Sequence, residues 1–197
     1  MIAAAASLIV EVLIRHGIIK VQQAEVYQYG LEILISSLLT CCITVVCGLL
    51  FRCLAAALLY FLMFAVLRSI CGGYHADTYW KCNLVFTLVT AVVLFFFRWM
   101  PVKQFTELHY CSIAIAILTT AFCTPVENEN KPLTCKQKKH FRVLGTVMVV
   151  LLALISCLLI HFYQSSYSVL IDMTLLAVSI SAFVTELQRG GDKGWQK

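Results

Sequence analysis

The segment Arg68–Cys82 carries residue types that could do chemistry, because His75 and Cys82 stand seven positions apart in it. An imidazole can take the proton of a thiol, which leaves a nucleophilic thiolate beside an imidazolium. On one unbroken helix this spacing would separate the two residues by roughly 10.5 Å along the axis. A hydrogen bond between them needs about 3 Å. Catalysis by this pair therefore requires that a helix start between the two residues.

The residues around the pair offer such a break. Asp77 is a suitable N-cap for a helix that carries Cys82, which leaves His75 in the preceding turn. Gly72 and Gly73 supply the backbone freedom that this turn needs. Spacing alone leaves open the simpler interpretation that His75 and Cys82 are ordinary residues near an interface. No metal site is expected, because His75, Asp77 and Cys82 lack a fourth ligand, and no cofactor is expected.

The remaining polar candidates are isolated. His16, His109, His140 and His161 are single and far apart in the sequence, which is typical of surface or interface residues. Asp172 lies near one end of an apolar run. A carboxylate inside a membrane segment is a functional candidate, but this position favours an interfacial residue or a contact between helices.

The elements that must position these residues belong to a membrane protein. Hydrophobic residues make up 61% of the 197 residues and charged residues 13%, whereas soluble domains have roughly 45–50% and 25%. The mean hydropathy is +0.88. These values exclude soluble globular and disordered chains. The net charge of +5 comes from basic residues between apolar runs, so it indicates membrane topology and not nucleic-acid binding.

Six apolar segments predict an all-α, polytopic membrane protein with a single domain over residues 1–197. They cover about residues 33–51, 53–67, 84–97, 111–123, 143–162 and 169–187, within a predicted transmembrane bundle over residues 31–187. The second and fourth are short for the ~20 residues of a spanning helix and could be re-entrant instead. Residues 1–30 predict one or two amphipathic helices, on the membrane surface or packed on the protein itself. Residues 188–197 are expected to form a cytoplasmic tail.

Lysine and arginine predict the orientation of this bundle. With six spans and the N-terminus inside, 12 of the 15 basic residues lie inside, and Arg52, Arg98 and Lys103 lie outside. The positive-inside rule then places both termini and the loops 68–82 and 124–142 in the cytoplasm.

Two motifs of the chain resemble a known family. Arg68, the run Gly72-Gly73-Tyr74-His75-Ala76 and then Cys82 resemble the signature of the AgrB family, the accessory gene regulator B proteins. The stretch 124–133, TPVENENKPL, resembles the cytoplasmic loop of that family. The length, the six apolar runs and the amphipathic start fit as well, so the resemblance covers nearly the whole chain.

The resemblance implies a membrane cysteine endopeptidase of quorum sensing, located in the bacterial cell membrane. Such proteins cut a short AgrD-like precursor peptide on its C-terminal side and help to close the remaining peptide into a thiolactone or lactone. The family's catalytic histidine and cysteine correspond to His75 and Cys82. Supporting or substrate-binding roles are expected for five further residues, namely Arg68, Gly72, Gly73, Asp77 and Lys131.

Two other functions remain open at this stage, a non-enzymatic transporter or export partner for a small peptide and a purely structural membrane subunit. Short spans around a polar catalytic loop leave little protein to keep water from the reaction. We therefore expect a homodimer whose interface helps to cover the site. The expected partners are the precursor peptide and the lipid bilayer, without nucleic acid.

Overall fold

The computed structural model of the chain describes residues 2–72, 79–126 and 134–194, with side chains as far as Leu187. These residues form seven α-helices and two short helical turns, with no strand among them. The elements are α1 (Ile2–Arg15), η1 (Val21–Gln23), α2 (Ala24–Leu50), α3 (Leu54–Cys71), α4 (Tyr79–Trp99), α5 (Val102–Cys123), α6 (Cys135–Leu158), η2 (Leu159–Tyr163) and α7 (Ser166–Gly194).

Six of these helices, α2 to α7, are long and apolar enough to cross a membrane. This confirms the predicted class, an all-α polytopic membrane protein. The two short apolar runs correspond to α3, with 18 residues, and α5, with 22, and both are continuous helices of spanning length. The helix α5 begins nine residues before its apolar run because Lys103, Gln104 and Glu107 lower the local hydropathy without interrupting the helix.

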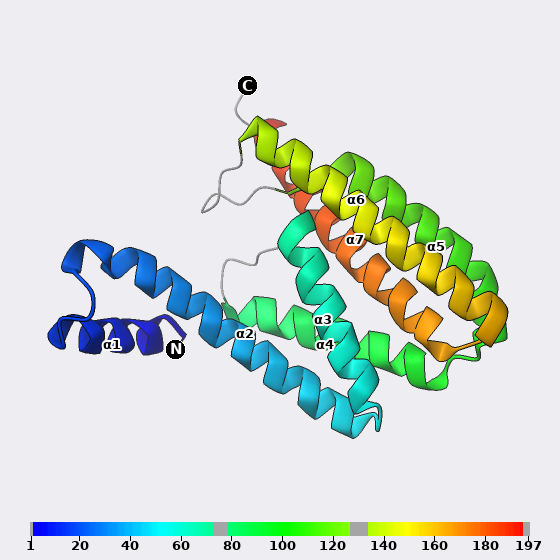
Figure 1. Cartoon of the computed structure of the whole chain (residues 1–197), viewed down its shortest axis with the longest axis horizontal. Helices are drawn as coiled ribbons and strands as arrows, with labels where there is room; N and C mark the ends of the chain where they lie inside the picture. Colours follow the sequence, from blue (N-terminus) through cyan, green and yellow to red (C-terminus); the bar gives the residue numbers. More distant parts are fainter. Residues whose placement is uncertain (1, 73–78, 127–133, 195–197) are drawn as a thin grey trace.

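The first helix lies apart from the rest of the bundle. Figure 1 shows α1 beside the N-terminal half of α2, away from α5, α6 and α7. Ala6 and Val10 are buried, whereas Leu8 and Val12 on the other face are exposed. The helix is therefore amphipathic, and it packs on the protein with one face and leaves the other face for lipid. Because α2 already begins at Ala24, the last residues of the segment 1–30 belong to this long helix.

The last helix, α7, is the centre of the bundle. It packs against α3, α4, α5 and α6 (Figure 1), and it is the most buried of the six spans. Its buried side chains include Leu170, Leu175 and Val178. An apolar helix that is covered on several sides fixes the position of its neighbours, so α7 sets the spacing of the helices that carry the candidate site.

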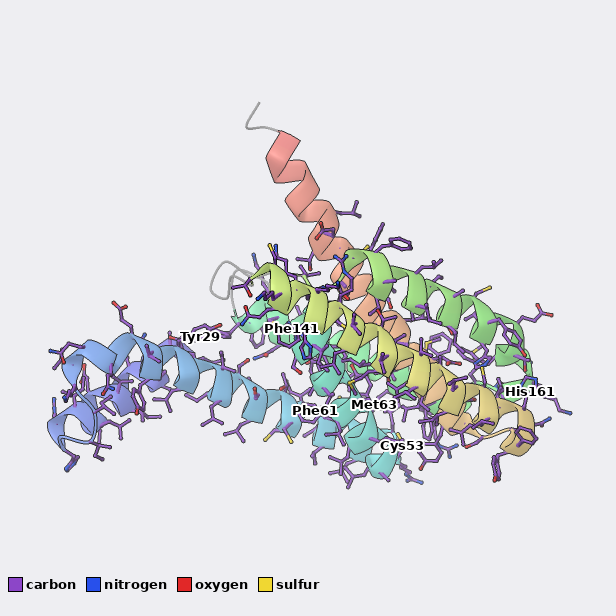
Figure 2. The ribbon with its side chains drawn as sticks, turned by 45° about the horizontal axis from the view of Figure 1, so that its top comes forward. Tyr29, Cys53, Phe61, Met63, Phe141 and His161 are labelled. Carbon is purple, nitrogen blue, oxygen red and sulfur yellow. The ribbon has the colours of Figure 1, made fainter. Side chains whose placement is uncertain are left out.

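The two ends of the bundle differ in how they are connected. At one end, which we call the hairpin end, short turns join α2 to α3, α4 to α5, and η2 to α7. At the opposite end, which we call the loop end, α3 stops at Cys71, α4 is described from Tyr79, α5 stops at Cys123 and α6 starts at Cys135. Figure 2 places Cys53 and His161 at the hairpin end and Phe141 near the loop end.

One sequence-based expectation about a polar residue is wrong. The sequence predicts His109 to be a surface or interface residue, but its side chain is 0% exposed. His109 lies within α5, and its Nδ1 is 2.6 Å from Oδ2 of Asp172 on α7. Asp172, also 0% exposed, is a contact between helices and not an interfacial residue.

Candidate active site

Cys82 lies at the loop end, on the first described turn of α4, and its side chain is half-buried. Arg68 reaches it from the last turn of α3, where its Nη2 donates a hydrogen bond to Sγ of Cys82 over 3.7 Å. The guanidinium also lies over the ring of Phe64, 5.9 Å from the centroid. A planar cation held on an aromatic ring is thus aimed at the only thiol of α4.

The end of α3 depends on Gly72. This residue has a φ of +75°, which side chains rarely adopt, and its N–H closes the helix on the carbonyl of Arg68 at 3.0 Å. A Cβ at this position would collide with the carbonyl oxygen of Val126. Only glycine therefore allows the chain after α5 to come this close to the end of α3.

That close approach joins the two loops of the loop end. The N–H of Val126 donates to the carbonyl of Cys71 at 2.9 Å, and Nε of Arg142 donates to the carbonyl of Thr124 at 2.8 Å. Segment 124–126 is thereby held between the end of α3 and the start of α6. Val126, the last described residue before Lys131, consequently lies beside Gly72.

The start of α6 is fixed by its own residues. Thr134 is the N-cap, and its backbone N–H donates to Oε1 of Gln137 at 2.9 Å while the N–H of Gln137 donates to Oγ1 of Thr134 at 3.4 Å. This reciprocal arrangement is a capping box. The basic residues that follow, including Lys136 and Lys139, are exposed at the loop end.

A polar contact between α2 and α4 was missed by the sequence analysis. The hydroxyl of Tyr79 donates to Oε2 of Glu32 over 2.8 Å, and Oγ of Ser36 donates to Oδ1 of the buried Asn83 over 3.5 Å. Tyr79 and Asn83 stand on either side of Cys82 in α4. These contacts hold the helix turn that carries the thiol. The available signal was Glu32, an acidic residue directly before the first apolar run.

The structure describes three of the predicted site residues and brings them to one place, namely Arg68, Gly72 and Cys82. The other four predicted site residues, Gly73, His75, Asp77 and Lys131, lie outside the described residues. The pairing of the imidazole of His75 with the thiol of Cys82 therefore stays a prediction. Within the described residues, no group of three or more histidine, cysteine, aspartate or glutamate side chains is arranged to hold a metal ion.

Comparisons with known proteins agree on one family. The family Accessory gene regulator B (AgrB) matches residues 6–183. An AgrB-like protein of Clostridium perfringens (strain SM101 / Type A) is 25% identical over 167 residues, which are 80% of this chain and 76% of the relative. AgrB-like protein 2 of Clostridium perfringens (strain 13 / Type A) is 24% identical over 154 residues, 75% of this chain and 72% of the relative. No solved structure matches the chain.

Proposed function

This chain belongs to the AgrB family, and we propose that it is the membrane cysteine endopeptidase that cuts an AgrD-type precursor peptide on its C-terminal side. Membership of the family links the chain to autoinducer processing in the accessory gene regulator system and implies a precursor of the AgrD type as its partner. Six apolar helices agree with a multi-pass protein of the bacterial cell membrane.

In the proposed reaction, Sγ of Cys82 attacks a peptide carbonyl carbon of the precursor. His75 takes the thiol proton and then donates it to the leaving amine, so the C-terminal fragment departs and an acyl-enzyme thioester remains. A cysteine within the bound peptide attacks this thioester next and closes a thiolactone. One thioester replaces another, so ring closure needs no ATP.

The observation that carries this proposal is the contact between Arg68 and Cys82. A guanidinium beside the sulfur offsets the negative charge that develops there when the proton leaves. The ring of Phe64 under the guanidinium and the contact of Tyr79 with Glu32 hold both partners in place. The thiol of Cys82 is also half-buried and so open to a substrate, unlike the buried thiols of Cys47 and Cys71.

We propose that the precursor peptide binds to the surface formed by the two joined loops. Because Val126 is bonded to Cys71, segment 124–126 is held beside the end of α3, the helix whose Arg68 contacts Cys82. The exposed Lys136 and Lys139 give this surface positive charge. We propose that Lys131 adds to this charge and contacts the precursor, while Gly73 and Asp77 shape the turn that carries His75.

Alanine substitution at two cysteines tests the proposal. Cys82→Ala should abolish precursor cleavage, whereas Cys123→Ala should leave it unchanged. Cys123 is a matched control because it is also a half-buried thiol at the loop end, on the last turn of α5. Both variants should insert into the membrane to the same level. Undiminished cleavage by Cys82→Ala would favour the export partner or the structural subunit instead.

We further propose that the loop end and both termini face the cytoplasm. The charge distribution supports this orientation, since Arg52, Arg98 and Lys103 are the basic residues that flank the hairpin end. An impermeant thiol reagent added to intact cells should reach Cys53 but not Cys82 or Cys135. Strong labelling of Cys82 or Cys135 would reverse the orientation.

We also propose that two copies of the chain assemble. Trp80, directly beside the candidate site, is 76% exposed, and Leu84 one turn further along α4 is 49% exposed. A second copy packed on this part of α4 would cover Cys82 and help to exclude water from the thioester. A monodisperse monomer with full activity in detergent would contradict the homodimer.

A further inference from the structure

A second group of reactive residues lies at the hairpin end, far along the helices from Cys82. It joins three helices: His109 from α5, Ser156 and Cys157 from α6, and Asp172 from α7. Nδ1 of His109 is 2.6 Å from Oδ2 of Asp172, and Oγ of Ser156 donates to Oδ1 of the same carboxylate over 2.8 Å. His109, Ser156 and Asp172 are all completely buried.

The hydrogen bonds determine where the proton of the imidazole lies. An ionised Asp172 can only accept, so its two oxygens then take the hydroxyl of Ser156 and the Nδ1–H of His109. Nε2 then carries the free lone pair. This atom faces Sγ of Cys157 at 3.4 Å. A carboxylate that orients an imidazole, which in turn accepts the proton of a nucleophile, is the arrangement of a catalytic triad.

The surroundings of His109 contain few other groups that titrate. Asp172 faces it from α7 and Cys157 faces it from α6. On the same helix, the ring of Tyr110 packs edge-on against the imidazole of His109, with 5.1 Å between the ring centroids. The hydroxyl of Tyr110 lies 3.4 Å from Nε2 of His161. The imidazole is thus held by one acid, one thiol and one aromatic ring.

The thiol of Cys157, unlike its partners, is only half-buried. Two residues after it the helix changes to the π-helical turn η2, and such turns are frequent at functional sites. A pocket of about 210 Å³ lies one helical turn further toward the hairpin end, lined by Val102, Lys103, Thr106, Ile160, His161 and Gln164. It combines apolar and polar groups, and its lining residues Ile160 and His161 follow Cys157 by three and four positions.

We propose that Asp172, His109 and Cys157 form a second acyl-exchange site, which takes peptide thioesters. Sγ of Cys157 attacks the thioester carbonyl carbon while its proton moves to Nε2 of His109. The carbon–sulfur bond to the leaving thiol breaks, and His109 returns the proton to that sulfur. The products are an acylated Cys157 and a free thiol, so no oxidant, reductant or other reactant is needed. The substrate class rests on the proposed function, because that reaction makes a thioester.

The test uses the full chain in lipid nanodiscs with Cys82→Ala, so that acylation is measured without precursor cleavage. The probe is the N-acetylcysteamine thioester of N-acetyl-phenylalanine, and peptide mass mapping follows the acylation of each cysteine. Cys53 is the internal control, since it is a half-buried thiol at the same end whose contacts among the described residues include no imidazole. Burial raises the pKa of the Cys53 thiol, and the nearby Arg98 partly lowers it again.

At pH 7 we expect Cys157 to be acylated about 10²–10⁴-fold faster than Cys53, which is the range of general base catalysis. His109→Gln should reduce the rate at Cys157 to that of Cys53. Equal rates at the two cysteines in the chain that keeps His109 would overturn the proposal and leave the cluster as a purely structural contact. Cleavage of the precursor by the chain with intact Cys82 is scored separately, so the failure of one proposal does not imply the failure of the other.

A pH series keeps the test decisive if His109→Gln does not fold. The thiolate fraction of an unassisted thiol with a pKa of about 8.5 rises roughly 80-fold between pH 6.5 and 9.0. The acylation of Cys53 should rise at least that much. Cys157 should rise less than about tenfold, because His109 already takes its proton at the lower pH. An equal rise at Cys53 and Cys157 would contradict the assigned role of His109.

Discussion

The loop end and the hairpin end both place a cysteine beside a polar partner, but they are built differently. Cys82 and Arg68 come from two successive helices and are 14 residues apart in the sequence. His109 is 48 residues from Cys157 and 63 from Asp172, and the three residues belong to three different packed helices. A site at a helix end next to long connections can receive a peptide. A site inside a bundle is held rigidly by the helices that carry it.

The two ends therefore depend on different parts of the structure. At the loop end, Gly72 packs closely against Val126 and ends the helix whose Arg68 contacts Cys82. At the hairpin end, short turns and buried hydrogen bonds fix the side chains with no contribution from a long connection. Cleavage should therefore be sensitive to changes in the loops, and the geometry of His109 should be sensitive to changes in the helices.

The largest expected effect on precursor cleavage is that of substituting His75. His75→Ala should lower precursor cleavage at neutral pH by about 10²–10⁴-fold, which is what a general acid–base group contributes. Raising the pH toward about 8.5 should restore part of the rate, because a thiolate then forms without the base. Rescue is partial because the leaving amine still lacks its acid. Cleavage rates between roughly pH 6.5 and 9.5 would measure this around the thiol's usual pKa.

The control for this substitution is His140→Ala, since His140 is an exposed histidine on α6 near the same end. The His140→Ala variant should cleave the precursor at the normal rate at every pH of the series. If His75→Ala cleaves the precursor at an undiminished rate at neutral pH, His75 is not the general base for Cys82. The comparison with His109 as the base for Cys157 would then fail.

Arg68 should have the next largest effect. Arg68→Ala removes a charged hydrogen bond to Cys82, which is worth about 1.5–3 kcal/mol, so cleavage should fall about 10–100-fold. Arg68→Lys keeps the charge but loses the planar contact with Phe64 and should give an intermediate rate. Single-turnover kinetics would compare the three chains. Normal cleavage by Arg68→Ala would mean that the contact with Cys82 does not serve the reaction.

A smaller effect is expected for the glycine that joins the loops. Gly72→Ala places a Cβ against the carbonyl of Val126 at a positive φ, so the free energy of unfolding should fall by about 1–3 kcal/mol. Gly30→Ala is the matched control, because nothing lies within 4 Å of the added Cβ. That substitution should stabilise helix α2 by up to about 1 kcal/mol. Thermal unfolding in detergent measures the stability of both variants. Equal stability of Gly72→Ala and Gly30→Ala would show that Val126 can move away from residue 72 at no cost.

The sequence predicts the membrane class well but the helix ends poorly. Apolar runs reveal the six spans because lipid requires about 20 apolar residues in a row. They miss the first turns of α5, where polar residues such as Lys103 and Glu107 belong to the helix. They also give no sign that α2 starts as early as Ala24.

The candidate site is predictable only where its residues are close in the sequence. Arg68, Gly72 and Cys82 belong to one motif, and the structure brings all three to the loop end. The contact of Tyr79 with Glu32 spans 47 residues, and the pairing of His109 with Asp172 spans 63. Contacts of this range depend on how the helices pack, which residue spacing within one segment does not encode.

The most direct test of the central claim is to capture the covalent intermediate. The chain is mixed with its precursor, quenched early in the reaction and analysed by mass, beside Cys82→Ser. Our account predicts an adduct with the mass of the N-terminal part of the precursor, located on Cys82 and removed by hydroxylamine. Cys82→Ser should lose nearly all turnover, because a serine hydroxyl is much harder to ionise than a thiol. An adduct on a residue other than Cys82, or undiminished cleavage by Cys82→Ser, would contradict the account.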